Sequence, residues 1–190
     1  MLLTPVFTPP LDTAVGGERL TVQLVDVKVT ADGYAFGFAN FERWVEMCRR
    51  CGVEYIEISH LFSQWGATMA PKIMGEKDGQ LVQLFGWDTD ATGPEYRDFM
   101  HQFLTSLTRE LEKLGIADKT YFHVSDEPTD EQFESYKAAK EMVEKDLKGY
   151  QMIDALSSYG FFEKGVVSQP ICSVDHIQPF LEKRPEKLWG

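Results

Sequence analysis

The stretch TYFHVSDEP, residues 120–128, predicts both a fold class and a place for chemistry. A mainly apolar run leads into two adjacent carboxylates, Asp126 and Glu127, and then into Pro128. Successive side chains of a strand point to opposite faces, so the two carboxylates could not share a pocket from inside a strand. Proline cannot donate a ladder hydrogen bond, and it favours extended geometry at the residue before it. We therefore expect a strand that ends near Ser125 and carries both carboxylates on the loop at its tip.

Helices and further strands alternate along the chain on both sides of this stretch. Apolar residues at helical spacing, with start signals at Asn40, Pro94 and Thr129, predict helices over 40–51, 94–114, 129–147 and 175–181. Apolar runs predict strands over 1–7, 53–59, 150–156 and 166–171, and a hairpin over 21–39. The segment 60–93 has no steady period, which at that length indicates a functional loop or one with small elements of its own.

This alternation indicates an α/β fold with a parallel sheet covered by helices. A doubly wound nucleotide-binding fold usually carries a glycine-rich phosphate loop after its first strand, and the sequence contains no such motif. A TIM-type barrel instead places polar and aromatic residues at the carboxyl ends of several strands. His60, the pair Asp126 and Glu127, and the residues from Ser157 to Tyr159 follow that pattern.

The strand count falls short of a complete barrel. About five to six barrel-type strands can be identified, whereas closure of a (β/α)8 barrel takes roughly eight strands and about 250 residues. We therefore expect residues 1–190 to form an incomplete (β/α)8 barrel that is part of a longer catalytic domain. The final residues, KLWG, resemble the start of another strand.

Composition narrows the classes of partner. With 30 acidic and 19 basic residues, the formal charge of -11 would repel nucleic acid over most of the surface. No apolar run approaches the roughly 20 residues of a membrane-spanning helix. The opening MLLTPVF is too short for a signal peptide and lacks its basic start, so the sequence assigns no compartment.

The three cysteines, Cys48, Cys51 and Cys172, do not indicate a zinc or disulfide framework. Cys48 and Cys51 have C-x-x-C spacing, but a tetrahedral zinc site needs a second pair, and a redox motif usually opens a helix after a strand. We expect two small thiols that face the core. No histidine or carboxylate spacing indicates a metal site, and we expect no cofactor.

Adjacent carboxylates at a barrel strand tip suit glycoside hydrolysis, in which one group acts as an acid while the other stays charged. Neighbouring positions fit direct displacement poorly, because that mechanism places the carboxylates on opposite sides of the bond. They fit substrate-assisted cleavage, in which the sugar's own 2-acetamido oxygen attacks the anomeric carbon. The alternative is that the acidic run only opens the next helix, where it meets the helix dipole; this explains Asp130 and Glu131 better.

YFHVSDEP, together with YIEISHLFSQWGA, QLFGWDTDA and QMIDALSSYGFFEKGVV, resembles the catalytic domain of glycoside hydrolase family 123, over about residues 1–189. The family comprises retaining β-N-acetylgalactosaminidases. The resemblance implies a (β/α)8 barrel, usually preceded by a β-sandwich domain, and cleavage through an oxazolinium intermediate. It implies that Asp126 orients the acetamido group and that Glu127 is the general acid and then the base. The substrate would be a glycan such as that of a glycosphingolipid, and the sandwich, the first part of the barrel and its closing strands would lie outside residues 1–190.

Other side chains are candidates for substrate binding. His60 and His123, at or near strand ends, could hydrogen-bond sugar hydroxyls, although His123 could equally be a layer residue inside the barrel. Trp65 and Trp87 could stack on a sugar or anchor their loop. Tyr159 could donate to the acetamido oxygen. Asp175 next to His176 is better explained as a helix cap.

Two other functions remain open on the sequence. The chain could be a carbohydrate-binding module or an inactive relative that keeps sugar affinity through its aromatic side chains. A nucleotide-dependent α/β enzyme is disfavoured because no phosphate-binding loop occurs.

Overall fold

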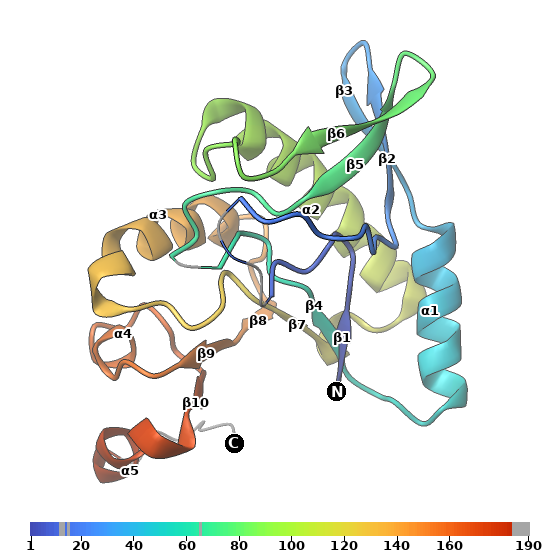
Figure 1. Cartoon of the computed structure of the whole chain (residues 1–190). Helices are drawn as coiled ribbons and strands as arrows, with labels where there is room; N and C mark the ends of the chain where they lie inside the picture. The colour runs from blue at the N-terminus through green and yellow to red at the C-terminus, as the bar shows by residue number, and fades with distance from the viewer. Residues whose placement is uncertain (12–13, 15, 65, 184–190) are drawn as a thin grey trace.

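The computed structural model describes residues 1–11, 14, 16–64 and 66–183. Its centre is a parallel sheet in the order β1 (Leu2–Thr4), β4 (Ile56–Ile58), β7 (Thr120–Phe122), β8 (Gln151–Met152). A second parallel pair, β9 (Asp154–Leu156) and β10 (Pro170–Cys172), continues from β8 after a break at Ile153 (Figure 1). The predicted α/β fold with a parallel sheet is confirmed. Within the described residues the sheets are open, and no closed barrel is formed.

A helix lies between each parallel strand and the next, except between β8 and β9, which only Ile153 separates, and one more helix follows β10. These helices are α1 (Ala39–Arg50), α2 (Pro94–Leu114), α3 (Phe133–Glu144), α4 (Gly160–Glu163) and α5 (Gln178–Lys183). Short 3-10 turns lie at η1 (Ala117–Lys119), η2 (Asp130–Gln132) and η3 (Val174–His176). None of the described helices is both long and apolar enough to cross a bilayer.

Local start and stop signals account for both ends of α2 and for the start of η2, but not for the start of α1. Pro94 begins α2, and Gly115 ends it in a left-handed conformation with φ 66°, which glycine adopts without steric cost. The predicted capping box of Thr129 and Gln132 is present and opens η2 just ahead of α3. The prediction for Asn40 is wrong, because it lies inside α1, whose N-cap is Phe38 and has no side-chain cap.

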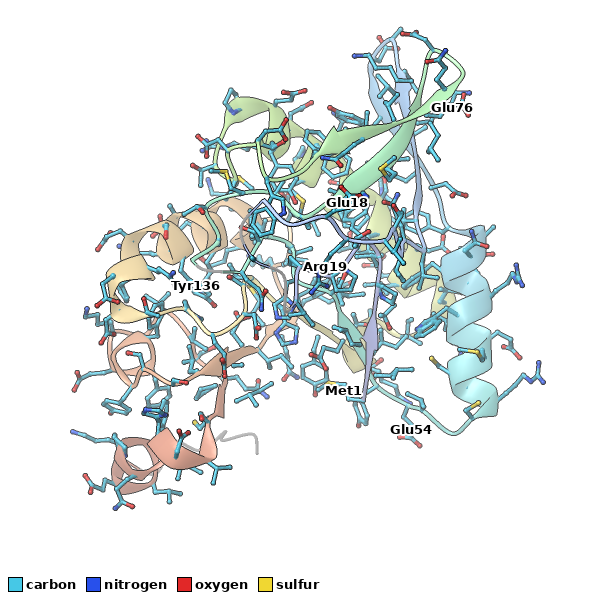
Figure 2. All side chains as sticks on the ribbon, in the orientation of Figure 1. Met1, Glu18, Arg19, Glu54, Glu76 and Tyr136 are labelled. Carbon is cyan, nitrogen blue, oxygen red and sulfur yellow. The ribbon has the colours of Figure 1, made fainter. Side chains whose placement is uncertain are left out.

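Two hairpins form a second sheet outside the parallel one. β2 (Asp26–Thr30) pairs antiparallel with β3 (Gly33–Gly37), and β5 (Ile73–Lys77) pairs antiparallel with β6 (Gln80–Phe85). β2 and β5 run parallel where Lys28 faces Glu76, and these two side chains form an ion pair at 2.6 Å (Figure 2). The segment 60–93 therefore carries an element of its own rather than a structureless loop.

The core lies between α2 and the strands around it. Phe99 and Phe103 of α2 are fully buried, and their rings pack on Phe7 at centroid distances of 5.6 and 4.5 Å. Phe36 of β3 and Phe85 of β6, in the second sheet, pack on the same helix, with centroids 5.7 and 4.7 Å from Phe99. The burial of these aromatic rings holds the second sheet against the parallel sheet.

The cysteines are free thiols, and only one member of the C-x-x-C pair faces the core. Cys48 is buried on the inner face of α1, whereas Cys51 is exposed. The expectation of two core-facing thiols is wrong for Cys51, because it is the C-cap of α1, where Gly52 turns the chain away with φ 75°.

Candidate active site

The ends of three parallel strands bring the candidate residues to one edge of the sheet. His60 follows β4, Asp126 follows β7, and Ser157 follows β9. Beyond the strands, Leu61 N–H donates to the carbonyl of His123 at 3.3 Å, and Phe62 N–H donates to that of Val124 at 3.1 Å. The chain that carries the carboxylates is thus still paired with the loop after β4 where it leaves the sheet.

The two adjacent carboxylates sit on a sharp turn. Asp126 is half-buried, and its Oδ2 accepts a hydrogen bond from Gln64 Nε2 at 2.8 Å. Glu127 is exposed and has φ 39°, so the expected extended geometry before Pro128 is wrong. A left-handed conformation at a residue with a Cβ costs on the order of 1–3 kcal/mol and is concentrated at functional sites. This turn allows neighbouring side chains to line the same cavity, which a continued strand would forbid.

A cavity of about 500 Å³ lies at this turn. Its lining residues come from the end of β7, from η2, and from the segments after β4, β9 and β10: Gln64, Asp126, Glu127, Pro128, Thr129, Asp130, Glu131, Ser157, Ser158 and His176. The volume lies within the range of small-molecule sites, and the lining is strongly acidic. Both members of the predicted carboxylate pair are therefore in one cavity.

Asp130 and Glu131 also line the cavity, and both act in the helix start as expected. They lie in the first turn of η2, where negative charge meets the helix N-terminus. Ser158 Oγ donates to Asp130, which ties the segment after β9 to η2. The hydrogen bond from Thr129 lowers the pKa of Glu131.

Of the lining residues, Gln64 and His176 were not predicted to be site residues, and Ser158 was named only within the strand-end span 157–159. Gln64 lies inside the block YIEISHLFSQWGA, so the resemblance was the available signal for it. Ser158 follows a strand end, which is also a usable signal. His176 was paired with Asp175, which was predicted to cap the following helix; that prediction is wrong, because Asp175 lies inside η3, whose N-cap is Ser173. The Nδ1 of His176 lies 3.1 Å from Asp175 Oδ1.

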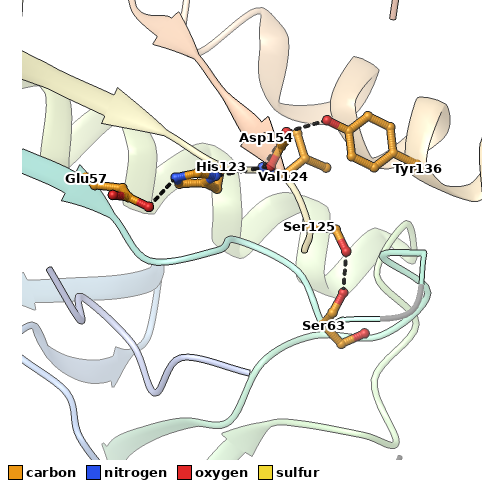
Figure 3. Close-up of polar contacts among 7 residues, drawn as sticks. All are labelled: Glu57, Ser63, His123, Val124, Ser125, Tyr136 and Asp154. Atoms are coloured by element: carbon orange, nitrogen blue, oxygen red, sulfur yellow. Dashed lines mark hydrogen bonds and ion pairs between the residues drawn. The ribbon is translucent and has the colours of Figure 1, made fainter. Parts of the chain in front are cut away.

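Buried and half-buried polar side chains form a continuous row near the ends of the parallel strands (Figure 3). His123 lies between two carboxylates, with Nε2 2.6 Å from Glu57 Oε1 and Nδ1 3.3 Å from Asp154 Oδ1. Asp154 also accepts from Val124 N–H at 3.1 Å and from the hydroxyl of Tyr136. The row joins β4, β7, β9 and α3.

These contacts determine the protonation of His123. Burial opposes the charged ring, but the hydrogen bonds to Asp154 and Glu57 and the charges of both carboxylates outweigh it and raise the pKa of His123 to about 9. The hydrogen bond from His123 lowers the pKa of Glu57. The row therefore contains an imidazolium with a carboxylate on each side.

His60 is the neutral counterpart of His123. The two rings stack with centroids 4.6 Å apart and planes tilted by 40°. Burial, together with the charge of His123, lowers the pKa of His60 to about 4. Its Nδ1 is buried and has no hydrogen-bond partner among the residues that the structure describes. Neither histidine is among the lining residues of the cavity, so their predicted contact with sugar hydroxyls stays a prediction.

His60, His123 and Asp154 also form the donor set that a metal ion would need, with one ligand atom of each within 4.8 Å of the others. Sequence spacing did not indicate this grouping, because its members come from three different strand ends. Hydrogen bonds already engage the histidine and carboxylate atoms of His123 and Asp154. The described contacts thus account for most of the cluster without an ion.

Trp87 and Tyr159, which were also predicted to bind substrate, are not among the lining residues of this cavity. Trp65 is outside the described residues. Trp87 Nε1–H donates to the carbonyl of Gly17 at 3.0 Å and lines a separate cavity of about 240 Å³ with Arg19 and Lys72, so in this structure it anchors its loop. The ring of Tyr159 packs edge-on against Phe180 at 5.1 Å rather than lining the acidic cavity.

Adjacent carboxylates in an acidic cavity, at the carboxyl edge of a parallel sheet, are the arrangement expected of a carbohydrate-cleaving α/β domain. The family model for the glycoside hydrolase 123 catalytic domain matches residues 1–189. The chain therefore belongs to glycoside hydrolase family 123.

A solved structure supports the fold. It is the family 123 glycoside hydrolase from Clostridium perfringens, studied for glycolipid glycan hydrolysis. The similarity has a TM-score of 0.59 at 15% identity and covers 82% of this chain and 27% of that one. At that identity the likeness establishes the fold alone, and the chain spans about a quarter of the length of that structure. A comparison with curated proteins gave no match.

Proposed function

We propose that this chain is the catalytic part of a glycoside hydrolase that cleaves β-linked N-acetylgalactosamine with retention of configuration. The observation that carries the proposal is the presence of Asp126 and Glu127 side by side in one cavity of a family 123 chain. The parallel strands would form part of a (β/α)8 barrel, and the substrate would be a glycan of the kind found on glycolipids.

In the proposed first step, the oxygen of the sugar's 2-acetamido group attacks the anomeric carbon while Glu127 protonates the departing glycosidic oxygen. The bond to the leaving group breaks, and an oxazolinium ion forms. Glu127 then deprotonates a water molecule that attacks the same carbon, which reopens the ring and retains the configuration. Each attack inverts the anomeric carbon, so the two together retain its configuration. Because the sugar's own acetamido oxygen makes the first attack, no enzyme nucleophile is needed.

The hydrogen bond from Gln64 supports the role proposed for Asp126, which is to hold the acetamido group. Its Oδ2 is fixed by Gln64, and the mechanism assigns Oδ1 to the acetamido N–H. A carboxylate at that N–H stabilises the positive charge that develops on the oxazolinium. Glu127 is exposed on the turn, so its side chain can reach a leaving group that extends towards solvent.

The first test compares 4-nitrophenyl β-N-acetylgalactosaminide with 4-nitrophenyl β-galactoside, which lacks the acetamido group. The mechanism requires turnover of the first and almost none of the second. Comparable rates on the two substrates would eliminate acetamido participation.

The second test separates the two carboxylates. Glu127→Gln should slow cleavage of a disaccharide, whose leaving group needs a proton, far more than cleavage of the 4-nitrophenyl substrate, which loses only the base that activates water in the second step. Asp126→Asn should reduce both by a factor on the order of 10² to 10³, the usual cost of removing one transition-state contact. Glu131→Gln is the matched control, because it removes the same charge from the same cavity; a loss as large as that of Glu127→Gln would contradict the assignment.

A further inference from the structure

The parallel pairing between β7 and β8 is interrupted in a specific way. Tyr121 and Phe122 pair with Gln151 and Met152, and Ile153 N–H donates to the carbonyl of Phe122 at 2.9 Å. Two residues beyond the end of β7, Val124 N–H donates instead to the side chain of Asp154, at 3.1 and 3.3 Å from its two oxygens. A carboxylate thus takes the place of a ladder carbonyl at the point where β8 ends and β9 begins.

This carboxylate is enclosed and fully engaged. Asp154 is 1% exposed, and a buried carboxylate needs hydrogen-bond donors to offset its lost hydration. The donors are Val124 N–H, His123 Nδ1 and the hydroxyl of Tyr136. These three donors hold the Asp154 carboxylate, and Glu57 in turn holds the other ring nitrogen of His123 (Figure 3).

The opposite side of the same backbone is also held. Residues 61 and 62 donate to the carbonyls of His123 and Val124, and Ser125 Oγ donates to the carbonyl of Ser63 at 2.8 Å. The chain over 123–125 is therefore clamped between Asp154 and the loop after β4. Asp126 is the next residue, and the same loop supplies its partner Gln64.

We propose that Asp154 is a positioning residue for the carboxylate pair: by holding Val124 N–H and His123 it sets the point from which Asp126 and Glu127 leave the sheet. The proposal rests on the function proposed above for that pair. Asp154 is not among the residues that line the cavity, so it acts through the backbone and not on the substrate. Misplacement of reacting groups by about 1 Å costs up to 10²-fold in rate, and that is the scale of effect expected here.

Asp154→Asn is the main test. Asparagine keeps the size of the side chain and one acceptor oxygen. Its NH₂ group replaces the second acceptor oxygen and therefore faces a hydrogen-bond donor that it cannot bind. We expect kcat on 4-nitrophenyl β-N-acetylgalactosaminide to fall on the order of 10²-fold with KM changed less than about threefold. The loss should be equal for good and poor leaving groups, unlike that of Glu127→Gln. Unchanged kcat, or a loss confined to poor leaving groups, would overturn the proposal.

Tyr136→Phe provides a milder variant in case Asp154→Asn does not fold. It removes one donor to Asp154 and should lower kcat about tenfold. Tyr150→Phe is its matched control, since the Tyr150 hydroxyl bonds to the carbonyl of Thr108 at 3.4 Å, away from the cavity. Equal activity losses in the two variants, tracking a common loss of folded protein, would reduce Asp154 to a structural role and overturn the proposal.

Amide hydrogen exchange tests the positioning without any assay of turnover. Exchange at Val124, Ser125 and Asp126 should be at least about tenfold faster in Tyr136→Phe than in Tyr150→Phe. If the unmodified protein shows no turnover, the proposed function fails, and this measurement still decides on Asp154: unchanged exchange would refute it. Loss of activity on addition of a chelator, with recovery on adding Zn²⁺, would also overturn the proposal, because Asp154 would then be a metal ligand.

Discussion

Replacing His123 with glutamine should remove a pH dependence of folding that the buried row creates. The pKa of His123 is raised from 6.5 to about 9 in the folded chain by Asp154 and Glu57, against the effect of burial. Because the folded value is the higher one, the stabilisation is fully present below pH 6.5 and disappears as pH rises towards 9. The whole shift corresponds to about 3 kcal/mol, of which about 2 kcal/mol is lost between pH 6.5 and about pH 8.5.

Urea unfolding of the unmodified chain and of His123→Gln, at both ends of that pH range, measures this term. Other groups titrate in the same range, above all the thiols of Cys48 and Cys172, whose pKa values burial raises. Both proteins carry those thiols, so the difference between the two pH dependences isolates His123. A decline of the same size in both proteins, or no decline in the unmodified chain, would refute the account of the row as an imidazolium between two carboxylates.

The remaining predictions concern the acid side, the cavity and the core. Since the pKa of His60 falls to about 4, it destabilises the fold as pH drops from 6.5 towards 4, and acid titration of His60→Gln should show a shallower decline in unfolding free energy. Gln64→Ala should lower kcat on 4-nitrophenyl β-N-acetylgalactosaminide about tenfold, because Asp126 loses its amide donor, with little change in the thermal midpoint; unaltered kcat would count against a fixed Asp126. Phe99→Ala should cost about 3–5 kcal/mol in urea unfolding, because the ring is fully buried in α2; a cost below about 1 kcal/mol would contradict the packing.

Features that depend on short-range chemistry could be predicted from the sequence. Pro94 and Gly115 delimit α2 because proline suits a first helical turn and glycine suits a left-handed end. The capping box at Thr129 follows from adjacent residues in the same way, whereas β7 ends at Phe122, before the predicted end near Ser125. Asn40 fails as a cap because a cap residue is also tolerated inside a helix, and the chain entering from β3 sets where α1 begins.

Features that depend on pairing between distant segments could not be predicted. The hairpin of β5 and β6 forms a sheet with β2, and no periodic pattern within 60–93 indicates that this segment pairs with β2. Asp154 falls within the predicted strand 150–156, and no neighbouring residue in the sequence indicates that its side chain accepts the hydrogen bond of Val124 N–H. The left-handed φ of Glu127 opposes the local preference before proline, so only the surrounding contacts account for it.

The location of the polar row explains why the site is held by hydrogen bonds and not by apolar packing. The chain leaves the sheet at the carboxyl ends of the strands, so backbone groups there lose their partners in the sheet. Val124 N–H is one of them, and because it is buried it needs a polar side chain, Asp154, as its acceptor. Compared with well-packed apolar side chains of the same volume, a buried ion pair adds little stability, because desolvation offsets most of its attraction. It does constrain geometry, since His123 can satisfy Glu57 and Asp154 together in only one orientation. Most of the apolar burial therefore lies in the aromatic core around α2, and the main role that we propose for the polar row is the placement of the two carboxylates.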